Sequence, residues 1–116
     1  RSAALGFEVA HIGINCENGE ASLEVCRKLD EAFALGVKEG NSSNFASNGI
    51  EVMKSMYLGK NGHIAIRTNS IPLAIAELAK KGFACDMETA KYKGERMIAV
   101  YLKEAFGGFA VHLLQK

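Results

Sequence analysis

The feature that most constrains the fold of this chain is an internal repeat. The segment His11-Ile-Gly-Ile returns as His63-Ile-Ala-Ile, and each half ends in an apolar strand that contains one polar residue. That polar residue is Glu51 in the first half and His112 in the second. Repeated units bury their apolar faces by packing against each other. We therefore expect one domain over 1–116, built from half-repeats at about 7–57 and 62–116.

The first half contains the pattern of a strand, a helix and three further strands. Alternation over 8–16 predicts a strand with Val9, His11 and Gly13 on one face. An apolar stripe at spacings of three and four residues predicts a helix over 20–34. Three short strands are expected after it, at 37–39, 44–47 and 50–54.

The second half repeats this order. A strand is expected over 63–68, followed by a helix over 71–81 that Ser70 caps, with Pro72 in its first turn. The charged run over 91–96 is interpreted as a solvated hairpin. The remaining strands are expected at 83–87, 96–103 and 108–115.

This duplicated order predicts an α+β fold in which two βαβββ modules form a curved mixed sheet around a cavity. Helices would cover one face of the sheet. The opposite face would carry four polar side chains, which are His11, Glu51, His63 and His112. Half-repeats of this kind can build their cavity within one chain or between two chains.

Four such side chains on strands favour a metal site. An unpaired buried polar group costs about 1–3 kcal/mol, and one divalent ion compensates several of them at once. Nitrogen and oxygen donors without a thiolate suit Zn, Ni, Co, Mn or Fe. For any one histidine alone, a hydrogen-bonded structural role is the commoner interpretation, and Glu51 could pair directly with His112.

Charge and cysteine content exclude several classes of protein. The formal charge is +1, which gives no electrostatic footprint for nucleic acid or a membrane surface. No apolar run approaches the roughly 20 residues of a spanning helix. The three cysteines include no CxxC pair, so we expect reduced thiols and a cytoplasmic protein.

Four motifs in this chain resemble the vicinal-oxygen-chelate superfamily, which includes glyoxalase I, extradiol dioxygenases and methylmalonyl-CoA epimerase. The motifs are His11-Ile-Gly-Ile, Gly49-Ile-Glu51-Val, Gly62-His63-Ile-Ala-Ile and Gly108-Phe-Ala-Val-His112-Leu. The resemblance implies that His11, Glu51 and His63 are metal ligands. His112 departs from the pattern, because glyoxalase I has a glutamate there that is a ligand and a base. The resemblance also implies a homodimer.

A second resemblance covers Glu39-Gly-Asn-Ser-Ser, Ile50-Glu-Val-Met-Lys, Gly62-His-Ile-Ala-Ile and Phe109-Ala-Val-His-Leu-Leu-Gln-Lys. These stretches are similar to a small chelate-fold domain that occurs alone or after a 4-hydroxy-2-oxoglutarate / 2-dehydro-3-deoxyphosphogluconate aldolase. The chain starts without Met, as expected of such a C-terminal piece. It is too short for the aldolase barrel itself, which needs about 200 residues or more.

These observations predict a glyoxalase-like, metal-dependent lyase or isomerase. Its substrate would be a small oxoacid, hydroxyacid or hemithioacetal that chelates the metal through neighbouring oxygens, with Glu51 or His112 as catalytic base. Arg67, on the same face, would bind a substrate carboxylate or phosphate, or would end in solvent. The polar run over 41–44 would contact an anionic ligand or form a solvated turn. The alternative function is a non-catalytic metabolite- or metal-binding domain associated with the aldolase.

Overall fold

Two βαβββ modules, preceded by a short helix, make up the fold, as the repeat predicts. The computed structural model describes residues 2–116, so the start at Arg1 lies outside the described residues. The first module contains β1 (Glu8–Ile14), α2 (Gly19–Phe33), β2 (Val37–Glu39), β3 (Ser43–Ala46) and β4 (Ile50–Met53). The second contains β5 (Gly62–Thr68), α3 (Ile71–Lys80), β6 (Cys85–Lys93), β7 (Arg96–Leu102) and β8 (Phe109–Gln115). The short helix is α1 (Ser2–Leu5).

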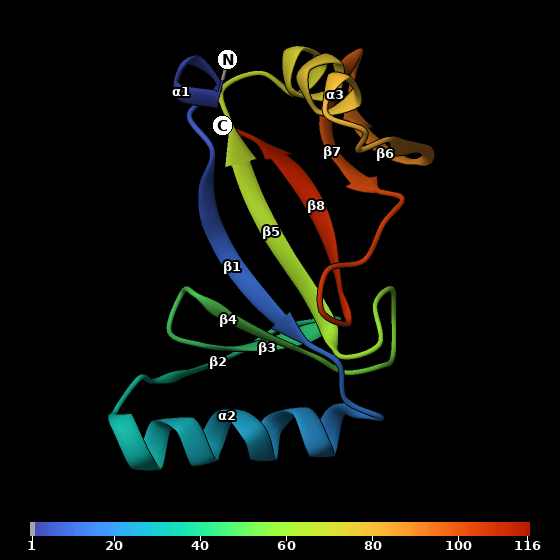
Figure 1. Cartoon of the computed structure of the whole chain (residues 1–116). Helices are drawn as coiled ribbons and strands as arrows, with labels where there is room; N and C mark the ends of the chain where they lie inside the picture. Colours follow the sequence, from blue (N-terminus) through green and yellow to red (C-terminus); the bar gives the residue numbers. More distant parts are fainter. Residues whose placement is uncertain (1) are drawn as a thin grey trace.

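All eight strands form one mixed sheet with the order β2-β3-β4-β1-β5-β8-β7-β6. Within each module the first and last strands are parallel neighbours, β1 with β4 and β5 with β8. The modules meet where β1 and β5 pair antiparallel. Figure 1 shows β1, β5 and β8 along the middle of the molecule, with α2 and α3 at opposite ends. The predicted α+β class with two βαβββ modules is confirmed.

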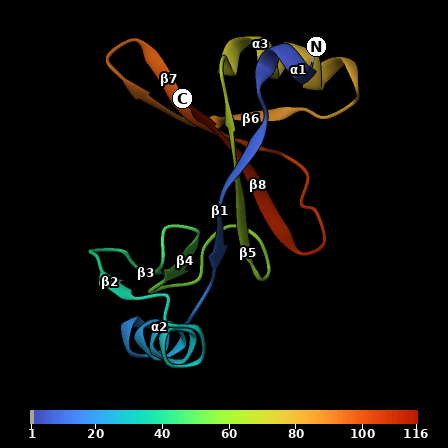
Figure 2. The same ribbon diagram turned by 90° about the vertical axis from the view of Figure 1, so that its left-hand side faces the viewer.

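The helices begin where the sequence predicts. Asn18 caps α2, because its side-chain oxygen accepts a hydrogen bond from Ala21 N at 2.8 Å. Ser70 caps α3 in the same way, accepting from Leu73 N at 3.2 Å. Figure 2 shows α2 below the β2–β4 part of the sheet and α3 with α1 at the other end.

Each helix covers a core of its own on the same face of the sheet. Cys26 of α2 packs with Ala46 and Val52, which alternate with the residues of the opposite face. The core of the second module includes Leu5, which α1 contributes. Its other buried members are Ile71, Ala74, Val100, Leu102 and Leu113. The opposite face of the sheet is therefore left without a helix.

A polar network fixes the β3–β4 hairpin against α2. Ser22 Oγ donates to the carbonyl of Val52 at 2.7 Å and accepts from Asn44 Nδ2 at 3.1 Å. Asn44 and Ser22 are both buried. Because a buried polar group without a partner is costly, this network ties the hairpin to one position on the helix.

Two features differ from the sequence-based expectation. The strand expected at 83–87 is longer and continues to Lys93, because β6 is an edge strand whose exposed charged residues suit a sheet edge. Strand β1 contains a bulge: Val9 lies opposite Ile66 and His11 opposite Ala65, which leaves Ala10 unmatched. The prediction that Val9 and His11 share a face was therefore wrong, and Glu8 takes the face of His11 instead.

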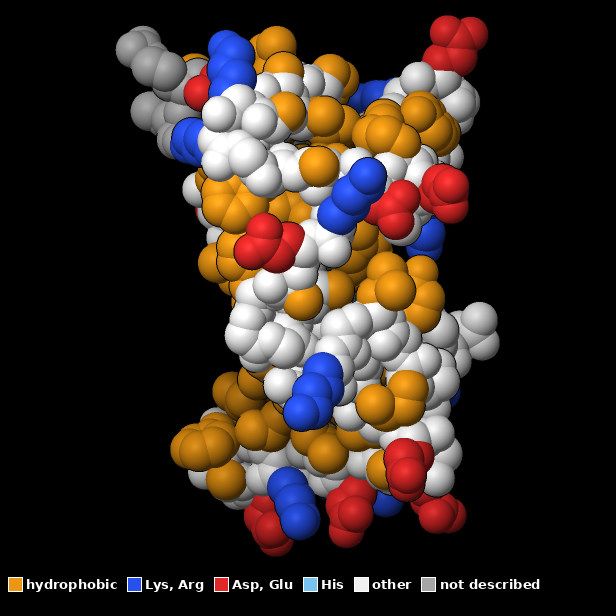
Figure 3. Space-filling model, turned by 45° about the vertical axis from the view of Figure 1, so that its right-hand side comes forward, with side chains coloured by type: hydrophobic (Ala, Val, Ile, Leu, Met, Phe, Trp, Pro, Cys, Tyr) orange, Lys and Arg blue, Asp and Glu red, His pale blue; other side chains and the backbone are white. Residues whose placement is uncertain are grey.

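The outer surface carries charges of both signs. On the face in Figure 3, Lys and Arg side chains alternate with Asp and Glu side chains. Within residues 2–116, every helix is too short or too polar to traverse a lipid bilayer.

Candidate metal centre

The strand register arranges the helix-free face in two rows of residues that cross the sheet. In the first row, Ala65 of β5 separates His11 of β1 from His112 of β8. In the second row, Gly13 of β1 separates Glu51 of β4 from His63 of β5. The four polar residues singled out from the sequence thus lie at four corners, with a small residue between the members of each row.

Gly13 leaves the space that the imidazole of His63 occupies. A Cβ atom at this position would lie 2.0 Å from Cε1 and 2.2 Å from Nδ1 of His63. Such a contact is far inside van der Waals distance, so no residue with a side chain fits without moving the ring. The absence of a side chain at Gly13 therefore allows His63 to lean across β1 towards Glu51.

Three donor atoms form a triangle with equal sides. Nε2 of His11, Nε2 of His63 and Oε1 of Glu51 are each 3.2 Å from the other two. A proton joins two of these atoms, whereas an ion bonds all three. Ligands about 2.1 Å from one ion lie about 3.0 Å apart at right angles and about 3.4 Å apart in a tetrahedron. The triangle therefore fits one face of the coordination shell of a transition-metal ion.

His112 is the fourth member of the cluster. One ligand nitrogen from each of the three histidines lies within 4.8 Å of the other two. Nε2 of His112 is buried and has no hydrogen-bond partner within residues 2–116. The ring of Tyr101, its neighbour on β7, stacks on the imidazole with centroids 4.6 Å apart. An orphaned buried nitrogen, on a ring that contacts two other imidazoles, is a donor available to an ion or a proton.

The protonation states suit metal binding. Hydrogen bonds from His11 and His63 hold the pKa of the Glu51 carboxyl well below its usual range, so the group is ionised. Burial, together with the neighbouring His63 and His11, lowers the pKa of His112 to about 4. Burial likewise raises the pKa of Tyr101 to about 12 and keeps its hydroxyl protonated. The donors are thus a carboxylate and an imidazole in their unprotonated forms, as metal ligation requires.

A second contact fixes the other oxygen of Glu51. The hydroxyl of Ser43 donates to Oε2 at 2.7 Å, across the β3–β4 pair. The sequence predicts that the polar run at 41–44 contacts an anionic ligand or forms a solvated turn. It does not predict a bond between Ser43 and Glu51. The alternation of β3 is the one available signal, because it places Ser43 on the same face as Phe45 and hence as Glu51.

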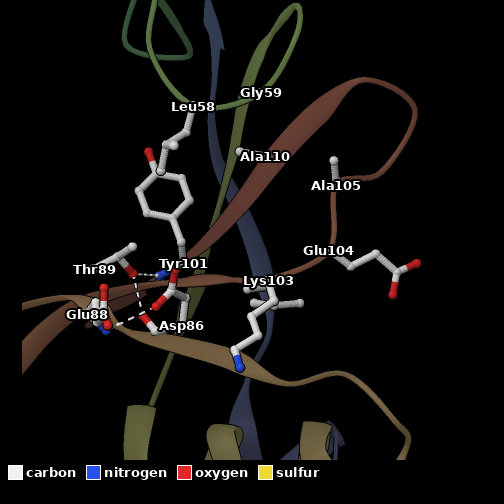
Figure 4. A pocket seen from close by; sticks show the side chains of 11 residues that line it. Leu58, Gly59, Asp86, Glu88, Thr89, Tyr101, Lys103, Glu104, Ala105 and Ala110 are labelled. Carbon is white, nitrogen blue, oxygen red and sulfur yellow. Dashed lines mark hydrogen bonds between the residues drawn. The ribbon is translucent and has the colours of Figure 1, made fainter.

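A cavity of about 450 Å³ lies beside the cluster. Tyr101 and Ala110 reach it from the sheet, and Ala110 is the neighbour of His63 on β8. Figure 4 shows Tyr101 rising towards Leu58, with Thr89 and Glu88 below it and Glu104 on the far side. A small molecule in this cavity would lie against the ring that stacks on His112.

Arg67 is the one predicted site residue that lies apart from the cluster. It shares strand and face with His63 but is four residues further along β5, where Nε pairs with Oε1 of Glu8 at 3.5 Å. More than a third of its side chain is exposed. The β-bulge at Ala10 brings Glu8 to this face, which is why the sequence pattern did not indicate the pair.

Comparison with known proteins identifies the fold. No family model matches the chain, and no curated protein sequence matches it significantly. Among solved structures, a hypothetical protein of Bacillus halodurans is 15% identical with a TM-score of 0.62, over 96% of this chain and 95% of that one. Methylmalonyl-CoA epimerase of Streptomyces coelicolor is 15% identical with a TM-score of 0.61, over 94% of each chain. The Mycobacterium tuberculosis epimerase is 16% identical with a TM-score of 0.55, over 92% of this chain and 86% of that one. The likeness shows that this chain shares their fold.

The first prediction concerns Gly13. Replacing it with Ala should weaken binding of Ni²⁺ or Zn²⁺ by about 10-fold to 100-fold, because the added Cβ displaces the ring of His63. Isothermal titration at pH 7 measures the affinity. Gly19→Ala is the matched control, since a Cβ there meets nothing nearer than 3.6 Å. Unchanged affinity in Gly13→Ala would contradict the role assigned to this glycine.

The second prediction concerns pH. The pKa of His112 is lowered to about 4 in the fold, so between pH 6.5 and 4 the unfolded chain takes up a proton that the folded chain does not. The free energy of unfolding of the metal-free protein should therefore fall as the pH drops through this window. His112→Gln should remove about 2–3 kcal/mol of that fall, measured by urea denaturation at pH 7.5 and pH 4. Parallel pH curves for the two proteins would refute the assignment.

Proposed function

We propose that this chain is a metal-dependent lyase or isomerase of the vicinal-oxygen-chelate superfamily. The observation that carries the proposal is the triangle of His11, Glu51 and His63 donors, 3.2 Å apart, beside the orphaned imidazole of His112. Superfamily membership is supported by the shared fold and by the ligand motifs in the sequence. The names of two of the neighbours describe epimerases, which favours isomerisation.

The metal would be one divalent ion, and the donor set suits Zn, Ni, Co, Mn or Fe. His11, Glu51 and His63 would hold it, with His112 as fourth ligand. When bound, such an ion supplies Lewis-acid chemistry by polarising two neighbouring oxygens of the substrate. A donor set of three imidazoles and one carboxylate leaves positions for these oxygens in an octahedral shell.

The proton would be moved by His112 or Glu51. Glu51 would be a weak base, because its Oε1 would bind the ion and its Oε2 already accepts a hydrogen bond from Ser43. Nε2 of His112 makes no hydrogen bond within the described part of the chain, so its lone pair is available. We therefore assign the removal of a proton from the carbon beside these oxygens to His112, which would leave the ion in order to act as base.

The substrate would be a small oxoacid, hydroxyacid or hemithioacetal. The cavity of about 450 Å³ beside Tyr101 has room for a molecule of this size. Arg67 would bind a substrate carboxylate, which would replace Glu8 as its partner. Association with a 4-hydroxy-2-oxoglutarate / 2-dehydro-3-deoxyphosphogluconate aldolase remains part of the proposal, resting on the second sequence resemblance.

Proton exchange with solvent tests the function. Protein loaded separately with each of the five metals is incubated in deuterated water with a panel of 2-oxoacids, 2-hydroxyacids and glutathione hemithioacetals, and deuterium uptake is followed by NMR. We expect uptake that His112→Gln lowers at least 100-fold while metal content stays near one equivalent. His63→Ala and Glu51→Ala should lose the metal itself.

Two results would overturn the proposal. Less than about a tenth of an equivalent of metal after reconstitution would exclude a metalloenzyme. Full metal content without exchange of any panel compound would favour the alternative, a non-catalytic binding domain associated with the aldolase.

A homodimer in the cytoplasm is proposed as the working state. Several large apolar side chains are exposed, among them Val9, Phe33 and Leu73, each more than 60% accessible. Figure 3 shows apolar side chains at several places on one face. The three cysteines form no disulfide within residues 2–116, which suits a reducing compartment. Sedimentation at micromolar concentration should give twice 12.5 kDa, and a species of 12.5 kDa alone would reject the dimer.

A further inference from the structure

The two oxygens of the Glu51 carboxylate have different partners. Oε1 lies 3.2 Å from Nε2 of His11 and of His63, whereas Oε2 accepts a hydrogen bond from Ser43 Oγ at 2.7 Å. Ser43 is buried, with 5% of its surface exposed. A short bond between a buried hydroxyl and a carboxylate is among the stronger hydrogen bonds of a protein and restricts rotation of the carboxylate plane.

The position of Ser43 is itself fixed from the other face of the sheet. Its neighbour Asn44 is buried and points to α2, where its Nδ2 donates to Ser22 Oγ at 3.1 Å. The side-chain oxygen of Asn44 accepts from Gly40 N at 3.3 Å. On β4, the carbonyl of Val52 accepts from Ser22 Oγ at 2.7 Å. The strand that carries Ser43 and the strand that carries Glu51 are therefore tied to the same helix residue.

We propose that Ser43 is a positioning residue that makes Glu51 a one-oxygen ligand. By occupying Oε2, it turns Oε1 alone towards the imidazoles of His11 and His63. A carboxylate free to rotate would bring both oxygens to the ion and fill a position that the substrate needs. This inference rests on the proposed metal-dependent function.

The second module lacks this device. In the first module, Phe45 lies opposite Glu51 and Ser43 is two positions before Phe45. In the second module, Tyr101 lies opposite His112, so the residue that corresponds to Ser43 is Ala99 of β7. An imidazole binds an ion through one nitrogen. Unlike a carboxylate, it needs no hydrogen-bond donor to keep a second ligand atom away from the ion. The hydroxyl is thus present in the half that carries the carboxylate and absent from the half that carries the imidazole.

The polar run at 41–44 divides into an exposed first half, Asn41 and Ser42, and a buried second half that fits neither interpretation of the run. Ser43 is neither solvated nor available to an anionic ligand, since its hydroxyl already donates to Glu51. Asn44 is equally buried and bonded within the fold. Ser43 therefore holds Glu51 directly, and Asn44 holds the strand that carries Ser43.

The test compares Ser43→Ala with Thr68→Val. Both changes delete a buried hydroxyl that donates one hydrogen bond, but Thr68 donates to the carbonyl of Leu5, away from the cluster. Titration with Co²⁺ at pH 7 gives the affinity, and the visible spectrum of bound Co²⁺ reports its coordination number. We expect about 10-fold to 100-fold weaker binding and an altered spectrum in Ser43→Ala. Thr68→Val should bind as the wild type does.

A double-mutant cycle shows whether Ser43 acts through Glu51. A Glu51→Gln background keeps an amide oxygen as a weaker ligand, so Co²⁺ binding can still be measured. There Ser43→Ala should change the remaining affinity less than 2-fold, because the carboxylate whose two oxygens it distinguishes is gone. Ser43→Thr, which keeps the hydroxyl, should restore binding to within about 3-fold of the wild type. Equal losses in both backgrounds, or an unchanged spectrum in Ser43→Ala, would overturn the inference while leaving the metal function standing. A wild-type protein that binds no Co²⁺, Ni²⁺ or Zn²⁺ would overturn the metal function itself.

Discussion

The candidate site depends on small residues at two positions of the sheet. Neighbouring strands lie about 4.8 Å apart, so residues on alternate strands of one row are about twice that distance from each other. Four donor side chains can converge from such positions only when the residues between them are small. Gly13 and Ala65 fill this requirement, one in each row. Ala65 is fully buried, and any Cβ at Gly13 would meet the ring of His63.

The site also straddles the line along which the two modules join. His11 and Glu51 come from the first module and His63 and His112 from the second, on either side of the β1–β5 pair. An ion bound to all four would cross-link the modules and add to the strand pairing between them. The modules differ in how they support it. The carboxylate is held through a buried polar network, whereas the imidazole of His112 is held by the stacked ring of Tyr101.

Most of the fold could be predicted from the sequence, because the repeat and the alternation of apolar residues report directly on strand order and burial. The convergence of His11, Glu51, His63 and His112 followed from their equivalent places in the two halves. The bulge at Ala10 could not be predicted, since it depends on pairing with β5 and leaves no mark in the alternation. The same limit hid the Glu8–Arg67 pair and the bond from Ser43, because both depend on which strands become neighbours. The full length of β6 was not predicted, because its charged residues are also typical of a loop. Only the strand order shows that β6 is an edge strand, where such residues are common.

The stacking of Tyr101 on His112 gives the molecule an optical reporter of its own. The chain has no tryptophan, and its three tyrosines emit more strongly than its six phenylalanines, so phenol rings dominate its ultraviolet emission. The ring of Tyr101 lies face to face with the imidazole of His112. The ring of Tyr57 contacts the ring of Tyr101 edge-on, with centroids 6.3 Å apart. A change in the electronic state of the His112 imidazole therefore alters the emission of two of the three tyrosines. A paramagnetic ion bound at the candidate site would quench both of them, because they lie close to it.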